Sequence, residues 1–186
     1  MEKFDTSTLK SVGKDVFISP LVSIVRPELV VLGNHISIDP WFHCTTALEI
    51  GDHVHIQAQV GIIGGKTGIL KMGNFTNISI KGTIICVSEK FYGKGLIATP
   101  GIPEKFLDEY KTGPVIFEDF VNTGANVTVL PGITLAEGSV IGACSLVTKN
   151  TEPWTIYAGI PARPIGTIGN RPKEKMLQYA KEMGYR

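Results

Sequence analysis

The chain has 186 residues, enough for one domain with a sizeable hydrophobic core. Its 18 Lys and Arg residues nearly balance its 17 Asp and Glu residues, which excludes a protein that binds nucleic acid through a strongly basic surface. Only 19% of the residues are charged and 21 are glycine, a composition typical of a turn-rich β protein.

The cysteines and the first residues bear on the cellular compartment. Cys44, Cys86 and Cys144 have no metal-ligand spacing, and their odd number argues against a disulfide framework, so we expect a reducing compartment. The opening MEKFDTSTLK lacks the apolar core of a signal peptide, and no run is long enough to span a bilayer. We therefore expect a cytoplasmic protein.

Two runs of apolar residues recur at every sixth position, after a short leading helix expected in KFDTSTLKSVG. Shorter runs in other phases begin at Val12 and Met72. A period of six fits neither an amphipathic helix nor a hairpin array, and it indicates a parallel β-helix whose leading aliphatic residues point inward. The leading positions are Leu32, Ile38, Cys44, Ile50, Ile56 and Ile62 in the first run and Phe117, Thr123, Val129, Leu135, Ile141 and Val147 in the second.

The segment IGDHVHIQAQVG, residues 50–61, places two histidines in one hexad. Because Val54 is expected to point into the lumen, His53 and His55 flank it and point outward. An outward histidine can be an ordinary surface residue, and we take His35 and His43 as such. The pair is a candidate for chemistry.

The hexads disappear between residues 87 and 113 and again near the C-terminus. The insert contains Phe91, Tyr92, Phe106 and Tyr110, which makes it too apolar for plain disorder, so we expect a functional loop rather than a surface excursion that only packs on the coils. Residues 171–186 form an amphipathic pattern after Pro172. We expect helices at both termini to cap the ends of the solenoid.

The repeat from Val12 to Ile165, and above all GANVTVLPGITLAEGSVIGACSLVTKNTEPWTIYAGIPARPIG, resembles the hexapeptide-repeat acyltransferases, most closely sugar O-acetyltransferases of the galactoside, maltose and surface-polysaccharide groups. The resemblance implies an all-β fold, a left-handed parallel β-helix with three hexads per coil. It further implies a homotrimer that binds acetyl-CoA between subunits. The expected single domain, 1–186, comprises a β-helix over 12–165, an inserted loop over 87–113 and a C-terminal helix over 171–186.

The resemblance implies transfer of acetyl from acetyl-CoA to a sugar hydroxyl, on a surface-polysaccharide unit or its precursor. One alternative is N-acetylation of a nucleotide-linked amino sugar. Because a free amine needs less help from a base, activity that survives the loss of His55 would point to it. Another is a zinc hydratase or a non-catalytic scaffold on the same fold. Neither nucleic acid nor a membrane is an expected partner.

The acceptor residues are assigned by the same resemblance. Surface-polysaccharide relatives carry a His-Ile step two coils ahead of the loop, which His55-Ile56 matches, so His55 is the expected general base, with His53 as second candidate. Glu89, followed by Phe91, matches an acidic and an aromatic residue near the loop start, and is the expected partner that orients the base.

The donor residues follow from the resemblance as well. Ala125 and Ala143 would let coenzyme A approach the backbone at two corners. Thr148 and Lys149 would reach its phosphates, and Arg163 would lie near its adenosine end.

Overall fold

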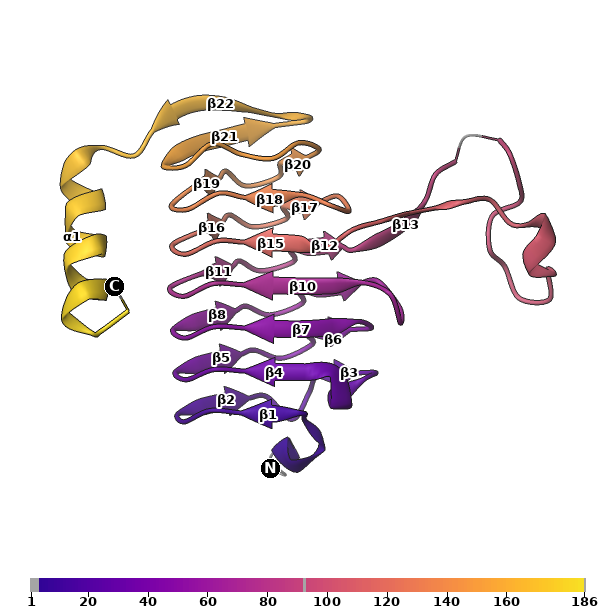
Figure 1. The fold of residues 1–186 in the computed structure, drawn as a ribbon, viewed down its shortest axis with the longest axis horizontal. Helices are drawn as coiled ribbons and strands as arrows, with labels where there is room; N and C mark the ends of the chain where they lie inside the picture. The colour runs from indigo at the N-terminus through magenta and orange to yellow at the C-terminus, as the bar shows by residue number, and fades with distance from the viewer. Residues whose placement is uncertain (1–3, 92, 186) are drawn as a thin grey trace.

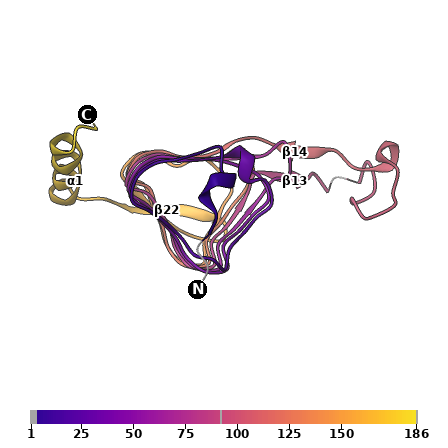
Figure 2. The ribbon, with the colours of Figure 1, turned by 90° about the horizontal axis from the view of Figure 1, so that it is seen from below.

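The hexads form the three sides of a triangular solenoid (Figures 1 and 2). The computed structural model describes residues 4–91 and 93–185, so Tyr92 of the insert lies outside the described residues. The first sheet contains β1 (Ser11–Val12), β4 (Val30–Leu32), β7 (Ala47–Ile50), β10 (Ile69–Met72), β15 (Val115–Phe117) and β18 (Thr134–Leu135).

The second sheet contains β2 (Val16–Ile18), β5 (Ile36–Ile38), β8 (Val54–Ile56), β11 (Asn77–Ile78), β16 (Asn122–Thr123), β19 (Val140–Ile141), β21 (Thr155–Gly159) and β22 (Ala162–Thr167). The third sheet contains β3 (Ser23–Ile24), β6 (His43–Cys44), β9 (Gly61–Ile63), β12 (Thr83–Ile85), β17 (Thr128–Val129) and β20 (Leu146–Val147). We call the edge between the first and second sheets the first corner, that between the second and third sheets the second corner, and the remaining edge the third corner.

The lumen is filled by the aliphatic residues that lead the hexads. Ile38, Ile56 and Ile78 stack on one another in paired strands of the second sheet, and all three are fully buried. Parallel pairing brings equivalent positions of successive coils into register, so one inward row follows from the repeat, and each outward row does too. The predicted outward stacking of His55 over Ser37 and of Gly61 over His43 is confirmed.

The first corner is built from a recurring sequence, Gly-Asn-His at 33–35 and Gly-Asp-His at 51–53. The side-chain oxygen of Asp52 accepts the backbone N–H of Asn34 at 2.7 Å, and Asn74 does the same for the N–H of Asp52 at 2.9 Å. Asx side chains commonly satisfy the backbone at turns. Glycine is required at position 33, because a Cβ there would overlap with the Asp52 carboxylate.

A stack of rings runs along the outside of this corner. The His53 ring lies 4.6 Å from that of His35 and 4.9 Å from that of Phe75, centroid to centroid, and Phe120 continues the stack at 5.1 Å. Trp154 extends it at 5.9 Å. Stacked or offset rings at these separations add stability beyond the area they bury.

The insert leaves the third corner as an arm (Figure 1). Its stem is a two-stranded antiparallel sheet of β13 (Val87–Glu89) and β14 (Tyr110–Thr112), and its tip contains a 3₁₀ helix at Glu104–Phe106. The arm projects away from the coils, on the side opposite α1 (Figure 2). It therefore does not pack on its own coils as a simple surface excursion would.

The ends of the solenoid differ from the expected helical caps. From residue 4 onward, the leading segment forms a 3₁₀ helix at Thr6–Thr8, in which Asp5 accepts the N–H of Ser7 at 3.0 Å. Another 3₁₀ helix lies at Pro27–Leu29. At the other end β22 turns back antiparallel on β21 and covers the last coil. The α-helix near the C-terminus, α1 (Asn170–Glu182), lies beside the first corner instead of over an end (Figure 1), because the ring stack offers it an apolar surface.

The chain end after α1 is tied to the first corner through Tyr185. Its hydroxyl donates to Oδ2 of Asp52 at 2.8 Å, and its ring meets that of His53 edge-on at 5.7 Å. Burial acts to raise the pKa of Asp52, but the hydrogen bonds from Asn34 and Tyr185 outweigh it and hold that pKa below its usual value of 3.8. The carboxylate therefore contributes to stability above about pH 4, and this contribution is lost as the pH falls through the lowered pKa.

Replacing Tyr185 with Phe removes the hydrogen bond and keeps the ring. We expect a loss of about 1 kcal/mol in the local docking free energy, seen as roughly fivefold faster amide hydrogen exchange in α1. Tyr179→Phe is the matched control, because Tyr179 meets the stack through its ring. Equal exchange rates for the two variants at pH 7, or a difference that persists well below pH 4, would contradict this account.

Candidate functional site

His55 stands at the centre of a polar row on the outer face of the second sheet. Its neighbours in register are Ser37 below and Asn77 above, and Asn122 continues the row on the next strand. These side chains line a shallow hollow of about 700 Å³. The row is a consequence of coil stacking, which aligns outward positions from segments far apart in sequence.

The partner of His55 is Asp39. Its Oδ2 lies 3.0 Å from Nε2 of His55, and Ser37 Oγ donates to the other carboxylate oxygen of Asp39 at 3.3 Å. A carboxylate on one ring nitrogen fixes the orientation of an imidazole and stabilises its protonated form, as a general base requires. We expected Glu89 in this role, since Asp39 belongs to no motif that would distinguish it in the sequence.

Glu89 does not orient His55 within the chain. Glu89 belongs to β13 at the third corner, whereas His55 belongs to β8 in the second sheet, and Oε1 of Glu89 accepts the backbone N–H of Ala98 at 2.5 Å. Within one chain the two residues stay apart because the insert turns outward from the corner instead of folding back over the coils.

His53 is held in the ring stack. Its Nε2 is buried and, among the described residues, has no hydrogen-bond partner. A base must reach the proton that it removes, and this nitrogen is enclosed by packing. We therefore carry only His55 forward as the candidate base.

Ala125 and Ala143 occupy equivalent positions at the second corner. The N–H of Cys144 donates to the carbonyl oxygen of Ala125 at 2.8 Å, so the two turns are in direct contact. A Cβ on the neighbouring Gly124 would lie 2.6 Å from the backbone nitrogen of Ala143. Glycine is thus needed at position 124, and the small side chains of Ala125 and Ala143 leave the backbone open to a ligand.

Lys149 and Arg163 come together at the C-terminal end of the solenoid. They line one cavity of about 260 Å³ with Tyr157 and Pro164. Arg163 donates to the carbonyl oxygen of Ala162 at 3.2 Å, which leaves most of its guanidinium donors for other partners. Thr148 adjoins Lys149 in the chain but does not line this cavity. Two cations around one small cavity make it suitable for phosphate.

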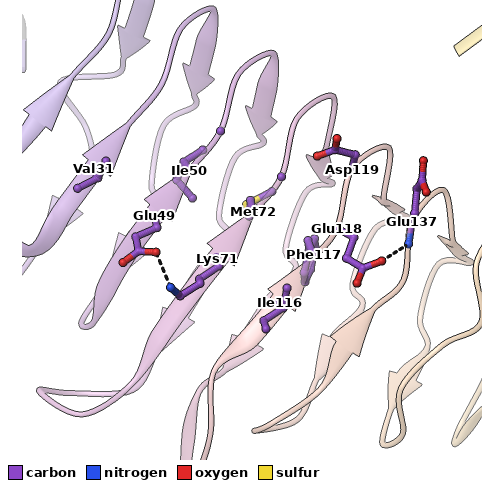
Figure 3. Close-up of a pocket in the computed structure, with 12 residues that line it drawn as sticks. Val31, Glu49, Ile50, Lys71, Met72, Ile116, Phe117, Glu118, Asp119 and Glu137 are labelled. Carbon is purple, nitrogen blue, oxygen red and sulfur yellow. Dashed lines mark hydrogen bonds and ion pairs between the residues drawn. The ribbon is translucent and has the colours of Figure 1, made fainter. Parts of the chain in front are cut away.

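A larger hollow, about 770 Å³, lies on the first sheet (Figure 3). Lys71 pairs there with Glu49 at 2.6 Å, and Glu118 accepts the backbone N–H of Glu137 at 2.9 Å. The rest of its charged lining is acidic, including Asp119. None of the sequence-predicted site residues lines it, and an acidic surface repels phosphorylated ligands, so we place no donor or acceptor there.

The sequence reasoning missed a fourth hollow, the arm-base hollow, of about 530 Å³. Its lining comes from the extra turn after β9 and from the arm stem: Ile63, Gly64, Gly65, Lys66, Thr67, Val87, Tyr110 and Thr112. The signal was present in GGKTG, residues 64–68, which interrupts the hexads just as the arm does.

Other chemistry finds little support in the described part of the chain. Across residues 4–91 and 93–185 no three His, Cys, Asp or Glu side chains converge as metal ligands would. Burial raises the pKa of Cys44 to about 11 and that of Cys86 to about 12, so neither is a thiolate nucleophile at neutral pH. None of the described helices combines the length and hydrophobicity that a bilayer span requires.

Comparison with known proteins identifies the family, although no protein-family model matches the chain. The dTDP-4-amino-4,6-dideoxy-D-glucose acyltransferase of Escherichia coli is 32% identical over 159 residues, 84% of this chain and 81% of that protein. A putative acetyltransferase of Schizosaccharomyces pombe is 51% identical over 57 residues, 31% of this chain and 28% of that protein.

Solved structures point to the same family as the sequence relatives. A variant of AntD, an N-acyltransferase from Bacillus cereus, in complex with dTDP-4-amino-4,6-dideoxyglucose and coenzyme A, is 31% identical with a TM-score of 0.88, covering 98% of this chain and all of that one (100%). AntD with dTDP and 3-hydroxybutyryl-CoA is 32% identical with a TM-score of 0.87, covering 95% and 93% of the two chains. The predicted fold, a left-handed parallel β-helix, is confirmed, and related structures bind coenzyme A as expected of the co-substrate. The chain belongs to the hexapeptide-repeat acyltransferases.

Proposed function

We propose that this protein transfers an acyl group from an acyl-CoA to the amino group of a nucleotide-linked amino sugar. The observation that carries the proposal is the similarity over nearly the whole chain to two N-acyltransferases, one of which binds a dTDP-linked amino sugar together with coenzyme A. This acceptor class was the alternative to sugar O-acetylation in the sequence analysis. The proposal requires an acyl-donor site and a base, and the chain offers candidates for both.

The donor would lie along the second corner. Ala125 and Ala143 would admit the pantetheine chain close to the backbone, and the cavity between Lys149 and Arg163 would take phosphate groups, with Thr148 beside it. Small residues and cations suit these two parts of coenzyme A for different reasons, close approach and charge neutralisation.

In the proposed reaction the amine lone pair attacks the thioester carbonyl carbon. The C–N bond forms, the C–S bond breaks, and the nitrogen loses one proton, which ends on the departing thiolate of coenzyme A. His55 would relay that proton while Asp39 stabilises the imidazolium. An amine is already a good nucleophile when unprotonated, so the base contributes less than it would with a hydroxyl acceptor.

A second candidate is transfer of acetyl to a sugar hydroxyl, such as that of a surface-polysaccharide unit. The His55–Asp39 pair favours it, because a hydroxyl must lose its proton as it attacks and a paired histidine supplies the base. The two candidates use the same donor and differ in how strongly they depend on His55.

We also propose that the protein acts as a homotrimer. The arm exposes apolar side chains far from its own coils: Phe91 is 64% exposed, Ile97 56% and Phe106 52%. Such a patch is costly in water unless a partner covers it. A neighbouring subunit would cover the arm and bring Glu89 toward an acceptor site shared between chains.

Removing the imidazole separates the two candidate reactions. With an amino-sugar acceptor at pH 8, we expect His55→Ala to retain turnover within about tenfold of wild type, whereas O-transfer would fall by about 10²–10⁴. Turnover is measured by release of free coenzyme A thiol. His43→Ala is the control, since His43 faces outward on the third sheet. A loss of 10² or more with the amine acceptor would favour a base-dependent reaction.

Lys149→Ala tests the donor cavity. We expect acetyl-CoA to bind about five- to tenfold more weakly, because one charge-assisted contact to phosphate is lost, while kcat at saturating donor changes little. Calorimetric titration measures the Kd. Lys14→Ala, at the opposite end of the solenoid, should bind acetyl-CoA like wild type. Unchanged affinity in Lys149→Ala would place the phosphates elsewhere.

A further inference from the structure

We propose that the arm-base hollow binds the nucleoside diphosphate half of the acceptor, with Lys66 as its phosphate-binding cation. This inference rests on the proposed function and adds the place and the residues that recognise the nucleotide. The extra turn, Gly64–Gly68, lengthens one coil without adding a strand. As a result, Ile50 pairs with Met72 rather than with a residue one standard coil later.

The extra turn is hydrogen-bonded at its base and leaves backbone amides available. It is closed by the N–H of Gly68 donating to the carbonyl oxygen of Gly64 at 2.9 Å, and Gly65 has a φ of +57°. Among the described residues, the backbone N–H groups of Lys66 and Thr67 have no acceptor. Consecutive open amides in a left-handed turn are a common anion-binding arrangement.

Packing fixes the turn against the coils. A Cβ on Gly64 would lie 2.9 Å from Cβ of Cys86 and 3.0 Å from Oγ1 of Thr46, so the turn sits directly on the solenoid wall. The hydroxyl oxygen of Thr45 accepts the N–H of Gly64 at 3.2 Å. A preorganised turn binds a ligand without a cost in ordering the loop.

Lys66 supplies an uncommitted charge. In the described ranges 4–91 and 93–185, it has no acidic partner within ion-pair distance, in contrast to Lys71, which is paired with Glu49. An exposed lysine beside open amides can neutralise a diphosphate as a point charge. The turn and the lysine together therefore account for the anionic part of a ligand.

The rest of the lining includes apolar and aromatic residues. Ile63 precedes the turn, and Val87, Tyr110 and Thr112 come from the arm stem. Small-molecule sites typically combine apolar and aromatic walls with a few convergent polar groups, in volumes that include the 530 Å³ found here. Apolar and aromatic residues of this kind would pack against a pyrimidine or purine ring.

The arm stem relates this hollow to Glu89. In the antiparallel pairing, Glu89 lies opposite Tyr110 and Val87 opposite Thr112, so all four side chains share one face of the stem. Glu89 is thus on the face that lines the hollow, one pair further out than Val87. A carboxylate there complements an amino group on the sugar, whereas coenzyme A offers no cation, which favours the acceptor over the donor as occupant.

The test compares Lys66→Met, which keeps the length of the side chain, with Lys71→Met as matched control. Calorimetric titration with dTDP should give a Kd weakened about tenfold or more in Lys66→Met and unchanged in Lys71→Met. Thymidine, which lacks the phosphates, should bind both variants and wild type alike. Acetyl-CoA affinity should be the same in all three proteins.

Three results would overturn the inference: no binding of dTDP to the wild type, equal dTDP affinity in both variants, or weakened acetyl-CoA binding in Lys66→Met, which would assign the hollow to the donor. Acyl transfer to a nucleotide-linked and to a free amino sugar separates this inference from the proposed function. If the wild type acylates both acceptors, and Lys66→Met has the same kcat/KM as wild type for the nucleotide-linked one, the proposed function stands and the nucleotide site is rejected.

Discussion

Register between successive coils is the constraint on which the rest of this structure depends. Each inward aliphatic residue lies directly over its equivalent in the coil below, as Ile56 lies over Ile38. The same pairing fixes the outward residues, so a polar row such as Ser37, His55 and Asn77 forms without any local motif that joins them. Burying the lumen therefore also positions the candidate site, and a change that shifted one coil would misalign both.

The candidate functional residues lie on the outer faces and corners of the solenoid, because packed apolar side chains fill its lumen. Buried thiols such as Cys86 are protonated, and the lumen holds aliphatic packing. The polar row lies on the second sheet, the second corner borders that sheet, and the arm leaves from the third corner, as Figure 2 shows for the arm. One chain therefore offers separate parts of a site, and the proposed trimer would combine them if the arm of one subunit reached the row of its neighbour.

The period of six predicted the lumen and the stacking of His55 over Ser37, since both depend only on spacing. It did not predict Asp39 as the partner of His55, because side-chain reach between coils depends on rotamers rather than on spacing. It did not show which subunit's site Glu89 would serve, because the direction in which an insert leaves a corner depends on its packing. The prediction that the C-terminal helix caps an end of the solenoid was wrong for a similar reason. The ring stack forms only when the coils are stacked, and α1 packs beside it.

The most direct test of the central claim is the chemical identity of the product. The purified protein would be incubated with acetyl-CoA and a dTDP-linked amino sugar, and in parallel with the analogue that carries a hydroxyl in place of the amine. Mass spectrometry would detect the added acetyl group, and hydroxylamine treatment distinguishes a stable amide from a labile ester. We predict a hydroxylamine-resistant product from the amino sugar alone. An ester formed on the hydroxyl analogue, with the amine left unmodified, would contradict the proposed N-acyltransferase.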